Sequence, residues 1–299
     1  RSLSDAGYVY ANIDDGWQDC GAGVDGSFHS KDGEPLVNKA KFPDISAMTE
    51  KAAELGLRPG FYFNNYICAE GMPKGGIGGE AYMRNMRGNV EFLRANRFDF
   101  VKLDTGSVYG DLQLWHDLIR DAGREMAVEN CHQGHDLPNA TWCPFDMFRV
   151  SGDLHVIGMD VEMWALAHWV QRASLGCWAY PDTVDPGSAQ VVRTQFGVYA
   201  VTSAPLLLSF DILDDAVLLP IWDIITNPDA IAVNQAWAGS PGGLVRKWSQ
   251  HLENDPMYAW AEDCDDADLA QGGWSYDEGT GLLRWAPPAG EQLCLTDGA

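Results

Sequence analysis

Positive charge is scarce in this sequence. Its 299 residues include 20 Lys and Arg against 43 Asp and Glu, so the formal net charge at pH 7 is −23. The isoelectric point is near 4.4. Nucleic acids and anionic membrane surfaces would repel such a chain, which argues against both kinds of partner. The charge balance suits a soluble protein that acts on neutral substrates.

Long apolar runs and dense cysteines are also missing. No run reaches the roughly 18 apolar residues that a membrane-spanning helix needs. The seven cysteines are too sparse for a small disulfide-built scaffold, although they permit two or three bridges. Asn139-Ala140-Thr141 matches the acceptor pattern for N-glycosylation. Together, the cysteines and this triplet favour a secreted location or one like a lysosome or vacuole.

The beginning of the sequence lacks a signal peptide. The opening stretch RSLSDAGYVYANIDD is typical of the end of a helix, a glycine stop and then a strand. We therefore expect a processed, truncated or fragmentary chain whose first structural elements are missing.

Apolar strand-like runs alternate with amphipathic helix-like stretches in the first four-fifths of the chain. This alternation predicts parallel βαβ units. The expected strands are at 8–13, 58–63, 99–103, 126–130, 145–150, 177–180 and 205–209, and the expected helices are near 44–56, 79–96, 110–122, 160–175 and 187–202. Seven such strands predict an α/β fold, a (β/α)8 TIM barrel over residues 1–237 that lacks its first strand. A doubly wound open sheet is the alternative, but no G-x-G-x-x-G follows an early strand.

The pattern changes after residue 237. The stretch AGSPGG is typical of a linker, and no helical period follows it. Short strand-like pieces with turn signals come next, among them MYAWAED and GGWSYDEGTGLLRWAPP. We predict that residues 238–299 are the start of a C-terminal all-β domain.

Charged and polar residues recur where the expected strands end. In a parallel barrel the C-terminal ends of all strands lie on one face, where active sites are built. The residues that would converge there are Asp14, Asp15, Lys102, Asp104, His132, Arg149, Asp153 and Asp182. A cluster of acids and bases around a cleft is costly unless it has a function.

A pair of carboxylates is the machinery of glycoside hydrolysis. One carboxylate is ionised and attacks the anomeric carbon or activates water, and the other is protonated and donates to the leaving oxygen. Lys102 lies two residues before Asp104 and so on the same strand face. We expect it to keep Asp104 ionised by opposite charge. Asp14 and Asp15 are suited to bind sugar hydroxyls.

Six segments of the chain resemble signature segments of one enzyme family. These are GYVYANIDDGW, FVKLDTGS, FRVSGD, WAYPD, FGVYAVTSAPLLLSFDI and IITNPDAIAVNQ. In this order they look like those of melibiase-type α-galactosidases of glycoside hydrolase family 27, clan D, over residues 5–237. The resemblance implies a retaining double displacement on terminal α-D-galactosyl residues, with no metal and no other cofactor. It also implies a partner that is a galactoside or an oligosaccharide, and it allows a homodimer.

The resemblance also assigns roles to individual residues. Asp104 matches the nucleophile and Asp153 the acid/base, while Asp14 and Asp15 match the pair that binds the galactose 4- and 6-hydroxyls. The remaining substrate-binding positions are Lys102, Arg149, Tyr62, Cys131, His132 and Asp182. Because the family often joins the two segments concerned, a Cys131–Cys143 disulfide is expected.

The chain departs from the family where ENCHQG stands in place of a more usual Cys-Glu-Trp segment. If Cys131 aligns with that Cys, His132 replaces the Glu at the position that separates galactose from N-acetylgalactosamine. A β-L-arabinopyranosidase, an α-N-acetylgalactosaminidase and a non-catalytic carbohydrate-binding remnant therefore stay open as alternatives. A metal site formed by Asp14, Asp15 and His132 lacks ligand spacing such as H-x-x-x-H.

Overall fold

The computed structural model describes residues 2–64, 68, 78–104 and 111–243, and the strand backbone at 273–277 and 282–286. The chain divides into two compact units, Arg1–Gly243 and Leu244–Ala299. In the second unit, β7 (Gly273–Asp277) pairs in antiparallel fashion with β8 (Leu282–Ala286). The rest of the predicted C-terminal all-β domain lies outside the described residues.

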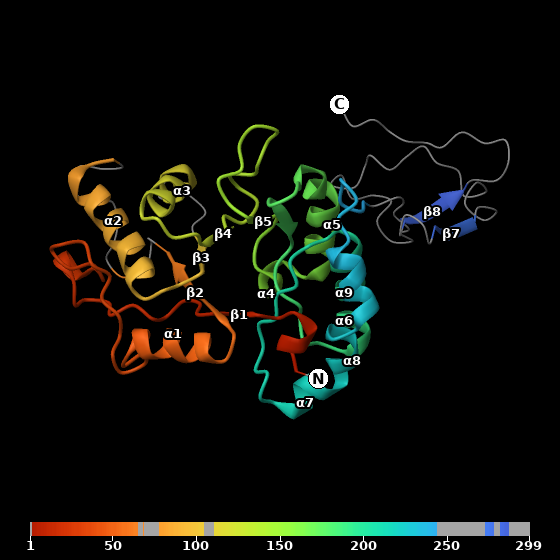
Figure 1. The fold of residues 1–299 in the computed structure, drawn as a ribbon, viewed down its shortest axis with the longest axis horizontal. Helices are drawn as coiled ribbons and strands as arrows, with labels where there is room; N and C mark the ends of the chain where they lie inside the picture. The colour runs from red at the N-terminus through yellow and green to blue at the C-terminus, as the bar shows by residue number, and fades with distance from the viewer. Residues whose placement is uncertain are drawn as a thin grey trace. The chain divides into compact units, whose positions relative to one another are not determined.

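A six-stranded parallel sheet forms the framework of the first unit (Figure 1). Its strands are β1 (Tyr10–Asn12), β2 (Arg58–Phe63), β3 (Phe100–Leu103), β4 (Ala127–Asn130), β5 (Met147–Arg149) and β6 (Trp178–Tyr180). The spatial order is β1-β2-β3-β4-β5-β6, so each strand lies beside the next one along the chain. A doubly wound sheet would reverse its strand order at a switch point. The doubly wound alternative is therefore wrong for this sheet.

Helices connect most of the neighbouring strands, as the alternating pattern predicts. The helices are α1 (Ile45–Glu54), α2 (Glu80–Ala95), α3 (Leu112–Asp121), α4 (Leu154–Ile157), α5 (Met159–Trp169), α6 (Ala189–Val201), α7 (Asp215–Leu218), α8 (Trp222–Ile225) and α9 (Pro228–Gln235). Short 3₁₀ turns lie at η1 (Ser4–Ala6), η2 (Val24–Gly26), η3 (Val170–Arg172) and η4 (Leu219–Ile221). Between β4 and β5 the chain runs through a loop with no helix.

Side-chain caps determine where several helices begin. The Asp44 carboxylate accepts a hydrogen bond of 2.9 Å from the Ala47 amide at the start of α1. Asp111 accepts one of 2.9 Å from Leu114 at the start of α3. An N-cap of this kind satisfies an amide that the helix itself leaves unpaired, which is worth about 1 kcal/mol.

Aromatic side chains fill the core beside β2. The Trp17 ring is fully buried and contacts Phe28, Phe61 and Phe63. Its indole Nε1 donates a 2.8 Å hydrogen bond to the carbonyl of Tyr62, as a buried indole usually requires. Trp17 thus ties the loop after β1 to the neighbouring strand and acts as a core residue.

The seventh expected strand, at 205–209, is wrong. This stretch makes one parallel bridge, between Val184 and Leu208, supported by a 2.8 Å hydrogen bond from the Val184 amide to the Leu207 carbonyl. Pro205 has no amide hydrogen to add to a ladder. Strand β1 pairs with β2 alone among the described strands, and its three residues are exposed.

No single helix in the described residues is both long and apolar enough to span a membrane. The two segments Asp215–Ile225 and Pro228–Gln235, bent by 61° against each other, meet that test only when taken together.

Candidate active site

The loops that follow the six parallel strands hold most of the polar residues singled out in the sequence. Because parallel strands all end at the same edge of the sheet, these loops meet there. Asp14 and Asp15 follow β1, Asp104 follows β3, Cys131 and His132 follow β4, Asp153 follows β5 and Asp182 follows β6. Tyr62, Lys102 and Arg149 lie within β2, β3 and β5.

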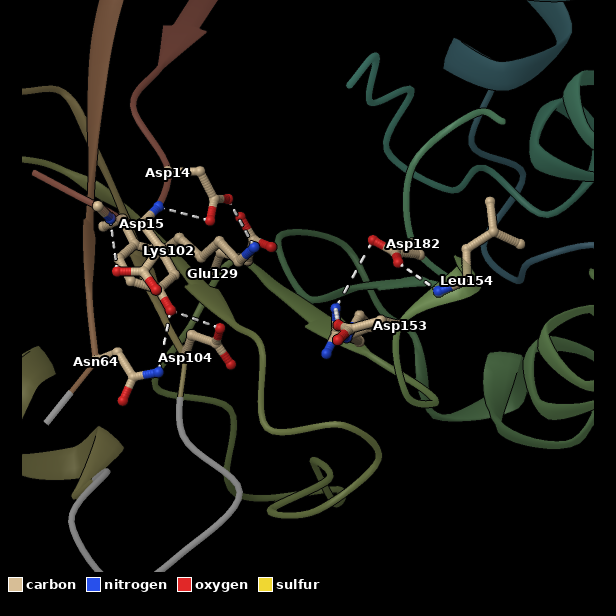
Figure 2. A network of polar contacts seen from close by, with 12 residues as sticks. Asp14, Asp15, Asn64, Lys102, Asp104, Glu129, Asp153, Leu154 and Asp182 are labelled. Carbon is tan, nitrogen blue, oxygen red and sulfur yellow. Dashed lines mark hydrogen bonds and ion pairs between the residues drawn. The ribbon is translucent and has the colours of Figure 1, made fainter. Parts of the chain in front are cut away.

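Asp104 is held by a tyrosine from the neighbouring strand. The Tyr62 hydroxyl donates a 2.8 Å hydrogen bond to Asp104 Oδ2. It accepts a 3.1 Å hydrogen bond from Asn64 Nδ2. Figure 2 shows Asn64 and Asp104 close to each other. Burial and the charge of Asp104 raise the pKa of Tyr62 well above its usual value. The phenol therefore keeps its proton and orients the carboxylate.

Lys102 forms its ion pair with Asp14, with 2.8 Å between Nζ and Oδ2. The sequence analysis predicted Asp104 as the partner of Lys102. In the described part of the chain the partner is Asp14 instead. The lysine reaches past β2 to the loop after β1, and its ammonium lies 5.4 Å from the centre of the Tyr62 ring. Burial alone lowers the pKa of Lys102, but Cys131, Glu129 and Asp14 outweigh it, so the pKa is raised.

Asp14 and Asp15 are exposed and shape a turn after β1. Asp14 Oδ1 accepts a 2.8 Å hydrogen bond from the Asp15 amide. Asp15 Oδ1 accepts one of 2.7 Å from the Gly16 amide, and Gly16 has a φ of 88°, which favours glycine. The Lys41 ammonium donates a 3.0 Å hydrogen bond to the Gly16 carbonyl. The turn thus leaves both carboxylates accessible.

A second cluster forms around Arg149. The guanidinium is 2% exposed and lies 2.7 Å from Asp153 Oδ1 and 3.7 Å from Asp182 Oδ1. Asp182 Oδ2 accepts a 2.9 Å hydrogen bond from the Leu154 amide at the start of α4. Burial alone would lower the pKa of Arg149. The acidic groups around it have the larger, opposite effect, so the pKa is raised. Figure 2 shows this cluster apart from the one around Asp104.

His132 is completely buried and tied to the loop that it belongs to. Its Nδ1 lies 2.7 Å from Asp136 Oδ2, and its Nε2 has no hydrogen-bond partner among the described residues. Burial lowers the pKa of His132, against the opposing effect of Asp136. The neutral imidazole therefore donates from Nδ1 to Asp136, and Nε2 is left as an acceptor.

The expected Cys131–Cys143 disulfide is wrong. Cys143 pairs with Cys177 and Cys20 pairs with Cys68, while Cys131 is free and buried. Cys131 directly follows β4 and its side chain is buried in the core. Cys143 lies on the loop before β5, which runs beside the segment before β6. The pairing of β5 with β6 therefore brings Cys143 to Cys177, whereas the family resemblance implied Cys131 as its partner.

Sequence reasoning missed Glu129, which lies on β4 and is 5% exposed. The Tyr180 hydroxyl on β6 donates a hydrogen bond to Glu129 Oε1. Burial raises the pKa of Glu129 to about 7, against the lowering effects of Lys102, Tyr180 and Arg149. A carboxylate within the predicted strand 126–130 was the signal that could have identified it.

The described residues contain no group of three or more His, Cys, Asp or Glu side chains placed to hold a metal ion.

No family model matches the chain, but curated relatives are named alpha-galactosidases. Alpha-galactosidase 2 of Arabidopsis thaliana is 27% identical over 263 residues, which cover 82% of this chain and 62% of the relative. The rice (Oryza sativa subsp. japonica) alpha-galactosidase is 25% identical over 279 residues, covering 85% of this chain and 62% of the relative. The chain thus spans about six-tenths of the length of these relatives.

Solved glycosidase structures share the fold. A Bacteroides fragilis structure assigned as alpha-galactosidase/melibiase aligns with a TM-score of 0.67 at 22% identity, over 83% of this chain and 56% of that one. The GH27 β-L-arabinopyranosidase of Geobacillus stearothermophilus aligns with a TM-score of 0.59 at 16% identity, over 82% and 73%. At these identities the likeness concerns the fold alone. The chain is therefore similar in sequence to alpha-galactosidases and similar in fold to glycosidases of the GH27 type.

Proposed function

We propose that this chain carries the catalytic part of a retaining exo-glycosidase that releases terminal α-D-galactosyl residues from oligosaccharides or glycoconjugates. The observation behind the proposal is a pair of carboxylates, Asp104 and Asp153, after strands β3 and β5 of one parallel sheet. Each is held by a different buried partner, Tyr62 for Asp104 and Arg149 for Asp153. The curated relatives named alpha-galactosidase support the substrate class.

In the first step Asp104 attacks the anomeric carbon, and an ester bond forms as the glycosidic bond breaks. Asp153 gives its proton to the glycosidic oxygen, so the aglycone leaves as an alcohol. The hydrogen bond from Tyr62 holds the Asp104 carboxylate in the geometry that attack needs.

In the second step Asp153, now a carboxylate, takes a proton from water. That water attacks the anomeric carbon, the ester bond to Asp104 breaks, and the free sugar leaves with its anomeric configuration retained. The Arg149 guanidinium, 2.7 Å from Asp153 Oδ1, would orient Asp153 in both steps. It donates a hydrogen bond to that oxygen while the acid is protonated and forms an ion pair once the acid is a carboxylate.

The remaining polar residues would bind the sugar. Asp14 and Asp15 are exposed and accept hydrogen bonds, which suits two neighbouring hydroxyl groups. Lys102 would bridge Asp14 and the sugar through its ammonium donors. The other predicted positions are Tyr62, Arg149, Cys131, His132 and Asp182. The first four are buried, so they would shape the site from behind its surface, and Asp182 is the most exposed of the five.

We also propose that the six strands belong to a (β/α)8 barrel in which a further strand pairs with the outer edge of β1. The strand order and the exposure of β1 support this. An unpaired strand edge is a liability that proteins cover. The two disulfides support an oxidising location, such as a secreted or vacuolar one.

The test is the release of 4-nitrophenol from its α-D-galactoside by wild type and by Asp104→Asn. The β-L-arabinopyranoside and the α-N-acetylgalactosaminide are assayed beside it. We expect turnover of the galactoside that the substitution reduces at least about 10⁴-fold, because covalent catalysis is lost. Folded protein that turns over none of the three substrates would overturn the proposal.

A further inference from the structure

A buried acid lies between the two clusters of the candidate active site. In the sheet register, Glu129 on β4 lies opposite Lys102 on β3. Tyr180 on β6, whose hydroxyl donates to Glu129, lies opposite Arg149 on β5. Glu129 is thus level with Lys102, and Figure 2 shows the two side by side. On β5 its register partner is Met147, two residues before Arg149, and the link toward Arg149 runs through Tyr180. Glu129 lies too deep to reach a sugar, because its side chain is almost fully covered.

Each cation forms an ion pair with an exposed acid and also acts electrostatically on the buried Glu129. Lys102 pairs with Asp14, whose side chain is 65% exposed, and Arg149 pairs with Asp153, whose side chain is 39% exposed. Solvent and salt weaken pairs of this kind. A carboxylate in the protein interior is screened far less and acts on both cations at once. The groups that act electrostatically on Glu129 are Lys102, Tyr180, Arg149 and Asp14, and Glu129 in turn acts on Cys131.

We propose, on the basis of the function proposed above, that Glu129 is a positioning residue. With its hydrogen bond from Tyr180, it holds Lys102 and Arg149 in place beneath the sugar and joins the Asp104 half of the site to the Asp153 half. If Glu129 only packed within the sheet, its buried negative charge would destabilise the fold and serve no function. The charge therefore distinguishes the two roles.

The charge of Glu129 changes in an accessible pH range, since its pKa lies at about 7. Above this pH the carboxylate attracts both cations, and below it the neutral acid keeps only its hydrogen bond. Glu129→Gln resembles the neutral form at every pH. We expect kcat/KM of this variant to fall about 10-fold below wild type at pH 8.5 and to approach wild type at pH 5.5.

Glu125→Gln is the matched control, because Glu125 is exposed and lies just before the same strand. It should equal wild type at both pH values. Tyr180→Phe removes a hydrogen bond that lowers the pKa of Glu129, so the pH at which activity changes should move upward. A ratio of wild type to Glu129→Gln that is the same at both pH values would overturn the proposal.

A second measurement does not need turnover and separates this inference from the proposed function. Urea unfolding is measured for wild type, Glu129→Gln, Lys102→Met and the double variant at pH 8.5 and pH 5.5. We expect the two substitutions to be non-additive at pH 8.5 and additive at pH 5.5. Additive effects at both pH values would overturn the positioning role, even if the enzyme hydrolyses galactosides. Non-additivity in a chain without turnover would support the pairing and leave the proposed function overturned.

Discussion

The hydroxyl of Tyr62 donates a 2.8 Å hydrogen bond to Asp104 Oδ2 from the neighbouring strand. The lysine two residues before Asp104 forms its ion pair elsewhere, with Asp14. Asp104 is therefore oriented by a neutral donor, while Lys102 on the same strand reaches to the loop after β1. A neutral donor of this kind can fix a carboxylate without cancelling its charge, which leaves the carboxylate able to attack carbon.

Tyr62→Phe tests that relationship. A hydrogen bond to a charged group is worth about 1.5–3 kcal/mol, so kcat/KM should fall about 10- to 100-fold. Most of the loss should appear in kcat, because the bond positions the attacking group. Tyr10→Phe is the control. Tyr10 lies on the exposed strand β1, and its hydroxyl accepts a hydrogen bond from Arg58 on β2. Equal loss in the two variants would contradict a specific role for Tyr62.

Glu162→Gln should change how stability depends on pH. Glu162 lies on α5, is fully buried, and its two carboxylate oxygens have no hydrogen-bond partner in the described part of the chain. Burial, helped by nearby Asp182, raises its pKa from 4.5 to about 8. Between these values the folded protein holds a proton that the unfolded chain has lost, so stability falls as pH rises.

The substitution to Gln removes this dependence. At pH 8.5 the variant should be more stable than wild type by about 1–3 kcal/mol, because Gln cannot ionise and so avoids a buried charge. Near pH 4.5 the gain should vanish. Urea unfolding at both pH values measures it, with Glu50→Gln on an exposed position of α1 as the control. A variant that loses stability at pH 8.5 would show that the Glu162 charge is stabilising.

The disulfide between Cys143 and Cys177 should contribute strongly to stability. Its partners are 34 residues apart, and closing a loop of that size in the unfolded chain is worth about 4 kcal/mol. Replacing both cysteines with Ala should lower the free energy of unfolding by roughly that amount. Peptide mapping without reductant gives a direct check. A linked pair of peptides containing Cys131 and Cys143 would contradict the structure.

The net charge of −23 should make stability depend on salt. Like charges repel in the compact state, and salt shortens the range of that repulsion from about 10 Å at 0.1 M to about 3 Å at 1 M. The thermal midpoint should therefore rise between 0.05 and 1 M NaCl, by about 2–4 °C for each kcal/mol gained. Equal osmolarity of a neutral sugar that is not a galactoside is the control. A midpoint that falls with NaCl would contradict this prediction.

The regular elements could be predicted because their signals are local. Strand β2 has the predicted limits, 58–63, and α1 lies within the predicted range 44–56. Both elements are predicted by an apolar pattern that repeats over neighbouring residues. The stretch at 205–209 is also apolar, but in the described part of the chain it forms one bridge, to Val184, and no ladder. Composition does not reveal such pairing. Six of the seven expected strands are confirmed.

The sequence indicated where the candidate site lies but not which of its side chains contact each other. Asp104 and Asp153 follow β3 and β5, and the parallel topology alone brings the ends of these two strands to one edge of the sheet. The partner of Lys102 depends on how far its side chain reaches across β2, and the partner of Glu129, Tyr180, lies on β6, two strands away. These contacts join residues that are 88 and 51 positions apart. No spacing rule within one strand reports on them.

The most direct test of the central claim is to trap the covalent intermediate on Asp104. The protein is incubated with a fluorinated α-galactosyl fluoride, which forms the ester quickly and hydrolyses it slowly, and is then digested for mass spectrometry. The account predicts one added fluorogalactosyl group, on the peptide that contains Asp104, and none in Asp104→Asn. A label on a different carboxylate, or galactoside turnover that persists in Asp104→Asn, would contradict it.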